Sequence, residues 1–250
     1  MTSATKRAAP MSLSRKTSDI VFYALLGLTL VIFLVQINII FLHTPIERTM
    51  GIVQKIFYFH VPSAYGMYLG AGACFLGSVA YFLSPTDARD AFAKAGAETA
   101  VVFGFIVLVS GPLWAAKAWG RYWVWDPRLT TSMLSVLIYV AYVVVRSFAG
   151  DGQAERKFAA ALGVVGAANL PIIHYSVQKW SGQHPVVIGS GGGGLAPGMH
   201  LPLFLGFGAF TLLALLLIWS RTRIELARSR LRQLEDEALT YLPEGETHGV

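Results

Sequence analysis

The chain has 250 residues, of which 54% are hydrophobic and 14% are charged, and its mean hydropathy is +0.55. These values lie outside the range of an ordinary soluble domain and indicate an all-α integral membrane protein. The formal net charge of +6 is explained by membrane topology and lipid contact, so it does not argue for nucleic-acid binding.

Six apolar segments approach or exceed the ~20 residues that a helix needs to cross a bilayer. They cover about 20–42, 61–83, 95–116, 131–145, 158–173 and 201–219. The first is too long for the core of a cleavable signal peptide, so we expect it to remain as an anchor. The sequence therefore predicts a six-span domain over 20–220, with tails at 1–19 and 221–250. The second tail has the pattern of a helix that continues to about Tyr241.

The Lys and Arg residues predict the orientation, because short cytoplasmic loops of membrane proteins carry an excess of them. Of the 20 in the chain, 14 fall on the side of the two tails. Both termini are then cytoplasmic. The segments 43–60, 114–130 and 174–200 lie on the opposite face, which is periplasmic or its equivalent.

A tryptophan-rich stretch lies between the third and fourth spans, with the sequence Trp-Gly-Arg-Tyr-Trp-Val-Trp-Asp over 119–126. Trp123 and Trp125 alternate as on an extended segment, whereas Trp119 and Trp123 are four residues apart, so no single regular element accommodates all three. Indole suits both a membrane interface and the face of a flat conjugated ligand. Composition alone favours the interfacial belt.

Cysteine usage excludes several kinds of chemistry. The one cysteine, Cys74, leaves no internal disulfide, no Cys-x-x-Cys centre and no attachment site for covalent haem, so we expect it to serve packing. No Walker A motif is present, so any nucleotide must bind another subunit. The glycines of 66–77 indicate close helix packing.

The histidines gather on the predicted periplasmic side, which holds five of the six: His43, His60, His174, His184 and His200. His60 precedes Pro62 and should sit at the mouth of the second span with its imidazole facing outward, because proline suits the first turn of a helix. Pro185 should hold His184 extended. One imidazole from each loop can bracket a metal.

Haem is a flat ligand with two propionate carboxylates, and its iron takes axial imidazole ligands from a protein. Each of these parts has a matching residue type on this face. The tryptophans can pack on the ring, and Lys55, Arg121 or Arg128 can pair with the propionates. A bare zinc site is less well supported, because no external carboxylate or thiolate cluster completes a tetrahedral set.

Three motifs carry a resemblance to a known family. The 119–126 stretch with Pro127-Arg128-Leu129-Thr130 resembles the WWD signature of haem-handling membrane proteins. Phe-His-Val-Pro-Ser-Ala over 59–64 and Asn-Leu-Pro-Ile-Ile-His-Tyr-Ser-Val over 169–177 resemble the histidine motifs of its CcmC branch. The likeness covers nearly the whole chain between the tails. Around His184 the family usually has Trp-Asn-x-Leu-His-Gln, whereas this chain has Trp-Ser-Gly-Gln-His-Pro. Because of this departure, His174 is the alternative to His184 as the second ligand.

The resemblance implies a six-span haem-binding protein of the bacterial inner membrane that is not an enzyme. Its WWD loop, about 114–130, would hold b-type haem non-covalently between His60 and His184 and pass it to the haem chaperone CcmE, alongside CcmD and the cassette subunits CcmA and CcmB. The loop residues expected at the haem are Trp114, Trp119, Trp123, Trp125 and Asp126. We expect Asp126 either to pair with Arg121 or Arg128, to accept an indole N–H, or to cap the fourth span.

Two other functions stay open on the sequence. A permease that moves haem or another small molecule would call for helices that are broken at mid-membrane depth. An assembly subunit would have no ligand of its own, and haem absorbance of the purified protein would separate it from a haem-binding protein.

Overall fold

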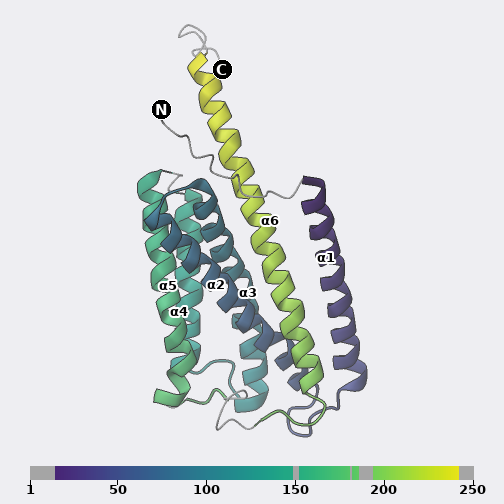
Figure 1. The fold of residues 1–250 in the computed structure, drawn as a ribbon. Coiled ribbons are helices and arrows are strands. Elements are labelled where there is room, and N and C mark those ends of the chain that lie inside the picture. Colours follow the sequence, from purple (N-terminus) through teal and green to yellow (C-terminus); the bar gives the residue numbers. More distant parts are fainter. Residues whose placement is uncertain (1–14, 149–151, 181, 186–193, 242–250) are drawn as a thin grey trace, which may run out of the picture.

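The computed structural model describes residues 15–148, 152–180, 182–185 and 194–241, and within them it confirms the all-α prediction (Figure 1). Apart from one isolated bridge between Glu47 and Gly51, the described residues contain no strand pairing. The long helices are α1 (Arg15–Asn38), α2 (Phe57–Leu83), α3 (Asp87–Trp119), α4 (Pro127–Phe148), α5 (Gln153–Trp180) and α6 (His200–Tyr241). Two short helical turns, η1 (Ile39–His43) and η2 (Ile52–Ile56), lie between α1 and α2.

Six helices are long and apolar enough to cross a membrane, as the hydropathy pattern predicts. The observed helices are longer than the predicted spans, most clearly α5, which has 28 residues against a predicted 158–173. The predicted spans end where the run of apolar residues ends, whereas the backbone hydrogen bonds of a helix continue through the polar residues that follow. The helix predicted to continue to about Tyr241 is confirmed by α6, but much of the 1–19 tail and residues 242–250 lie outside the described residues.

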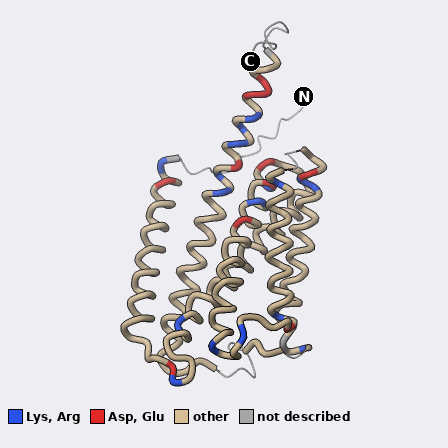
Figure 2. Tube along the Cα trace, turned by 180° about the vertical axis from the view of Figure 1, so that it is seen from behind, with Lys and Arg blue, Asp and Glu red and all other residues tan. Residues whose placement is uncertain are grey.

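Charged residues gather at the two ends of the bundle and leave a long uncharged middle (Figure 2). One end holds the start of α1 and the long extension of α6, and the opposite end holds the tryptophan-rich segment between α3 and α4 (Figure 1). This distribution is what a bilayer requires, since charged side chains are costly at its centre.

Glycines bring α2 and α3 into direct backbone contact, as predicted for the 66–77 region. A side chain at Gly70 would lie 2.5 Å from the Ala100 nitrogen, and one at Gly77 would lie 2.7 Å from the Ala93 nitrogen. Cys74 is buried in the same interface. Lipid tails are as apolar as the side chains, so the hydrophobic effect does not drive helices together within a bilayer. Small residues favour association there because they allow close van der Waals packing.

Helix α2 begins earlier than expected, so the predicted place of Pro62 in its first turn was wrong. The η2 turn leads directly into α2 at Phe57, five residues before Pro62. A proline inside a helix leaves the carbonyl four residues earlier without its N–H donor. That carbonyl belongs to Tyr58, and it accepts a hydrogen bond of 3.2 Å from Gln36 Nε2 in α1, which also donates to the Pro202 carbonyl at 3.3 Å. One buried amide thus joins α1, α2 and α6.

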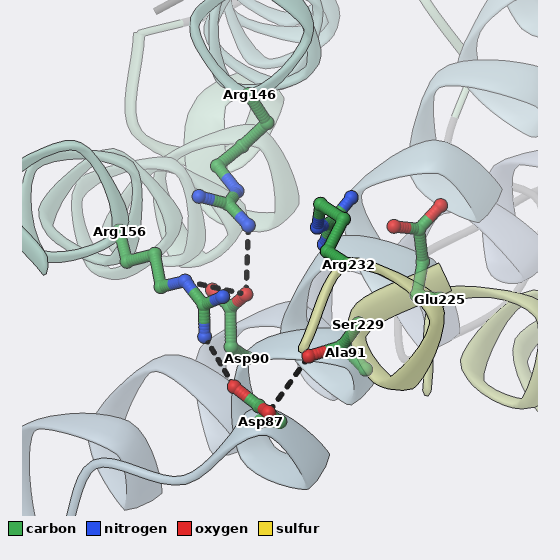
Figure 3. A pocket seen from close by; sticks show the side chains of 8 residues that line it. All are labelled: Asp87, Asp90, Ala91, Arg146, Arg156, Glu225, Ser229 and Arg232. Atoms are coloured by element: carbon green, nitrogen blue, oxygen red, sulfur yellow. Dashed lines mark hydrogen bonds and ion pairs between the residues drawn. The ribbon is translucent and has the colours of Figure 1, made fainter. Parts of the chain in front are cut away.

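Ion pairs fasten the other end of the bundle, where side chains of α3, α4, α5 and α6 converge (Figure 3). Arg146 Nη2 of α4 lies 2.7 Å from Asp90 Oδ2, and Arg156 Nη1 of α5 lies 2.6 Å from Asp87 Oδ1. Ser229 of α6 donates to the same Asp87 at 2.7 Å. The extension of α6 is therefore tied to the helices whose far ends carry the tryptophan-rich segment.

Candidate functional site

The tryptophan-rich segment is irregular, as the mixed spacing predicts. Helix α3 ends at Trp119, and Gly120 follows in the left-handed region with φ of 69°, where glycine carries no steric penalty. Residues 120–126 are not helical. The indoles form two edge-to-face pairs, Trp114 with Trp119 and Trp123 with Trp125, each with ring centroids 5.8 Å apart.

The indole N–H groups of these pairs differ in their partners. Trp114 Nε1 donates to Gln54 Oε1 at 3.2 Å, which fixes the end of α3 against η2. Trp123 Nε1 is buried and has no hydrogen-bond partner among the described residues. The Trp125 side chain is 74% exposed. The Trp123–Trp125 pair therefore presents an open aromatic surface beside an unsatisfied donor.

Asp126 connects this segment to the loop after α5. Its Oδ1 accepts from the Leu129 backbone N–H at 2.8 Å, which confirms the predicted cap at the start of α4. Its Oδ2 accepts from the His184 backbone N–H at 3.3 Å. Both donors are backbone groups, so among the described residues the contacts of this carboxylate include neither the expected pairing with Arg121 or Arg128 nor the expected indole N–H.

His184 is half-buried, and its ring is oriented through Nδ1. That nitrogen lies 3.0 Å from the Pro185 carbonyl oxygen and 3.4 Å from Arg128 Nη1. The two contacts require opposite roles of Nδ1; the shorter one is decisive, because 3.4 Å is long for an N–H donor. A carbonyl only accepts, so Nδ1 carries the proton. Burial, with the Arg128 guanidinium next, lowers the pKa of His184 to about 4, so the imidazole is neutral at neutral pH.

Arg128 holds the start of α4 against the end of α5. Its Nη2 donates to the His174 carbonyl at 2.9 Å, and its Nε donates to the Ile173 carbonyl at 3.3 Å. The planar guanidinium can make several such bonds in fixed directions. The two donated bonds fix α4 against α5, and the loop that carries His184 lies beside them.

His60 lies in the first turn of α2 and faces α3, which differs from the predicted outward orientation. Its Nδ1 is 2.9 Å from Ser110 Oγ, and a side chain added at Gly111 would lie 3.1 Å from its Cε1. The ring is therefore held between two helices. His60 at the start of α2 and His184 in the loop after α5 lie at the same end of the bundle, because Gln54 just before α2 contacts Trp114 and the His184 backbone contacts Asp126.

The remaining candidate residues differ in their exposure and in their contacts. Lys55 is buried, donates to the Phe41 carbonyl at 3.3 Å and lies 5.3 Å from the centroid of the Phe41 ring. Arg121 is exposed. His174 is exposed with its ring against Tyr175, and it contributes to the site through its carbonyl.

Two residues at the site were missed by the sequence analysis. Ser110 contacts His60, and Gln54 contacts Trp114. A polar side chain next to Gly-Pro within the apolar 95–116 segment was the available signal for Ser110, but only helix packing shows which histidine it faces.

Comparison with known proteins gives matches over most of the chain. Residues 4–237 match the family described as CcmC, Heme exporter protein C. Heme exporter protein C of Bradyrhizobium diazoefficiens is 34% identical over 193 residues, which cover 76% of this chain and 73% of that protein. The Escherichia coli protein of the same name is 38% identical over 144 residues, which cover 56% of this chain and 57% of that protein. A putative cytochrome c biosynthesis ccmC-like mitochondrial protein of Marchantia polymorpha is 32% identical over 167 residues, 66% of this chain and 71% of that protein.

Proposed function

The chain belongs to the Heme exporter protein C family, and from this membership we propose that it binds haem at its tryptophan-rich end and delivers it to the haem chaperone CcmE. The family itself supplies the coarser role, which is haem handling in a multi-pass membrane protein of cytochrome c maturation. We place the protein in the bacterial inner membrane with both termini cytoplasmic, following the distribution of Lys and Arg.

The observation that carries the proposal is the position of His60 and His184 at the same end of the bundle, where both rings are oriented by protein contacts. His60 comes from α2 and His184 from the loop after α5, and each ring is held through Nδ1 by a protein oxygen. Among the described residues, none forms a hydrogen bond with Nε2 of either ring. Neutral imidazoles that are oriented in this way are what the iron of haem takes as axial ligands.

The surrounding residues fit the rest of a haem. Trp123 and Trp125 offer apolar ring faces, and the buried Trp123 N–H is available to a ligand oxygen. Lys55, Arg121 and Arg128 add positive charge for two propionates, with Arg121 the most exposed of them. The chain has no cysteine at this end, so binding would be non-covalent and b-type.

Exposure of the site supports delivery to a partner. Trp125 is 74% exposed and Tyr122 is 66% exposed, so a bound cofactor at this surface would stay reachable by an acceptor protein. We propose that CcmE docks here and that the helper CcmD and the cassette subunits CcmA and CcmB associate elsewhere. The cassette subunits would supply the energy that releases the loaded chaperone. The protein itself would catalyse no hydrolysis.

Absorbance spectra of four alanine variants test the ligands. We expect His60→Ala and His184→Ala to lower the haem content or alter the spectrum, and the double variant to lose its low-spin bis-imidazole bands. His174→Ala is the matched control, because it removes an exposed ring and keeps the carbonyl that binds Arg128. A wild-type spectrum in His184→Ala, combined with loss of haem in His174→Ala, would show that His174 and not His184 is the second axial ligand.

Capture of CcmE tests delivery. Haem-loaded wild-type protein should retain far more CcmE than the His60→Ala, His184→Ala double variant. The membrane partners should remain bound to both forms, because the variant changes only two side chains at the tryptophan-rich end and leaves the rest of the bundle intact. Equal recovery of CcmE would show that haem is not part of the docking surface, and loss of every partner would indicate misfolding.

A further inference from the structure

The hydrogen bonds of Ser110 determine which nitrogen of His60 carries its proton. Ser110 has one hydroxyl proton, and its Oγ lies 2.6 Å from the Ile106 carbonyl oxygen one turn earlier in α3. A carbonyl oxygen has no proton to donate, so a contact this short must be a hydrogen bond in which the serine hydroxyl is the donor. The serine is thereby committed as a donor to its own helix.

The contact between Ser110 and His60 then has only one possible direction. Ser110 Oγ lies 2.9 Å from His60 Nδ1 and can only accept there, so His60 must donate from a protonated Nδ1. In a neutral imidazole the proton on one nitrogen leaves the lone pair on the other. Nε2 is therefore the nitrogen of His60 that can bind a metal.

We propose that Ser110 is a positioning residue that holds His60 as the Nδ1–H tautomer and so selects Nε2 as the ligating atom. The proposal rests on the proposed function, in which His60 binds the haem iron. Gly111 supports the same arrangement, because a side chain there would lie 3.1 Å from Cε1 and displace the ring. Consecutive residues of α3 thus fix both the proton and the plane of the imidazole.

The tautomer can be measured without haem. Long-range nitrogen–proton NMR correlation of the haem-free protein, labelled with ¹⁵N-histidine and assigned with His60→Ala, distinguishes a protonated Nδ1 from a protonated Nε2. Wild type should show Nδ1–H at His60. Ser110→Ala removes the acceptor and should raise the Nε2–H population. Ser110→Thr keeps a hydroxyl that can bond the Ile106 carbonyl and should restore the wild-type signal.

Haem titration of the same proteins supplies the second readout. Loss of the partner that orients a histidine ligand typically weakens metal affinity about 10–100-fold, so Ser110→Ala should bind haem that much more weakly and Ser110→Thr should recover. Ser147→Ala is the matched control, since the Ser147 hydroxyl bonds the carbonyl four residues earlier at 2.8 Å, as in Ser110, but on α4 at the other end.

The outcomes separate this inference from the proposed function. Nε2–H in the wild type, or a tautomer that Ser110→Ala leaves unchanged, overturns the role of Ser110. Unaltered haem affinity in Ser110→Ala also overturns it when His60→Ala lowers affinity. If His60→Ala itself binds haem as the wild type does, ligation by His60 is wrong, and the positioning role is lost with it.

Discussion

Asp126 and His184 are joined by a hydrogen bond from the His184 backbone N–H to the Asp126 carboxylate at 3.3 Å, 58 residues apart in the chain. The other carboxylate oxygen caps α4 through the Leu129 N–H at 2.8 Å. The start of α4 and the loop that carries His184 therefore share one side chain. The last residue of the tryptophan-rich stretch thus positions a candidate iron ligand from another loop.

Substitutions at Asp126 should separate these two contacts. Asn is as good a helix cap as Asp but has only one acceptor oxygen, so Asp126→Asn should keep most of the stability and still disturb His184. Asp126→Ala should cost about 1 kcal/mol for the lost cap in addition. Thermal unfolding in detergent and the haem spectrum measure the two effects. A normal haem spectrum in both variants would show that the carboxylate does not position His184.

Arg128 should not tolerate replacement by lysine. Its guanidinium donates to the Ile173 and His174 carbonyls, and a lysine keeps the charge without the planar arrangement of donors. We expect Arg128→Lys to lose stability by roughly 1.5–3 kcal/mol for each charged hydrogen bond that is broken, and to lower haem content. Arg121→Lys, at an exposed position, should behave as wild type in both measurements. Wild-type stability and haem content in Arg128→Lys would show that the site needs only the positive charge of Arg128.

The Trp123 N–H should have opposite effects on the haem-free and haem-loaded protein. It is buried without a partner among the described residues, and such a donor costs about 1–3 kcal/mol. Trp123→Phe should therefore leave the haem-free protein equally stable or more stable. If the N–H finds its partner in the bound cofactor, the same variant should retain less haem. Trp114→Phe, which breaks the bond to Gln54, should instead destabilise both forms.

The Asp90–Arg146 ion pair should support the fold and leave the haem site unaffected. Its side chains are 9% and 2% exposed, and removal of one partner from a buried pair costs about 3–5 kcal/mol. Asp90 also lies 3.6 Å from Arg156 Nε, so the loss of Asp90 breaks two ion pairs and should cost more than the loss of Arg146. Asp90→Asn and Arg146→Met should each lower the unfolding temperature markedly. Replacing both residues together should recover part of the loss, because the charge of Arg146 is then removed with its partner and Arg156 keeps its ion pair with Asp87. Haem spectra of the folded fraction should match wild type, because the pair lies at the opposite end of the bundle (Figures 1 and 3).

Several features of this protein follow from local properties of its sequence. Hydropathy summed over about 20 residues identified the six spans, because each helix meets lipid on its own. The mixed spacing of Trp119, Trp123 and Trp125 predicted an irregular segment, and the structure has one. The glycines of 66–77 predicted close helix packing, because a residue without a side chain allows a neighbouring helix to approach whichever helix that is.

Other features depend on how the helices face one another, and only the tertiary structure decides them. The ring of His60 turns toward Ser110, 50 residues away, and not outward as expected, because α3 packs against that side of α2. The early start of α2 became possible because Gln36 of α1 takes the carbonyl that Pro62 leaves free. Each such contact joins polar groups from separate helices, and the face that a helix turns to its neighbour is set by the packing of the whole bundle.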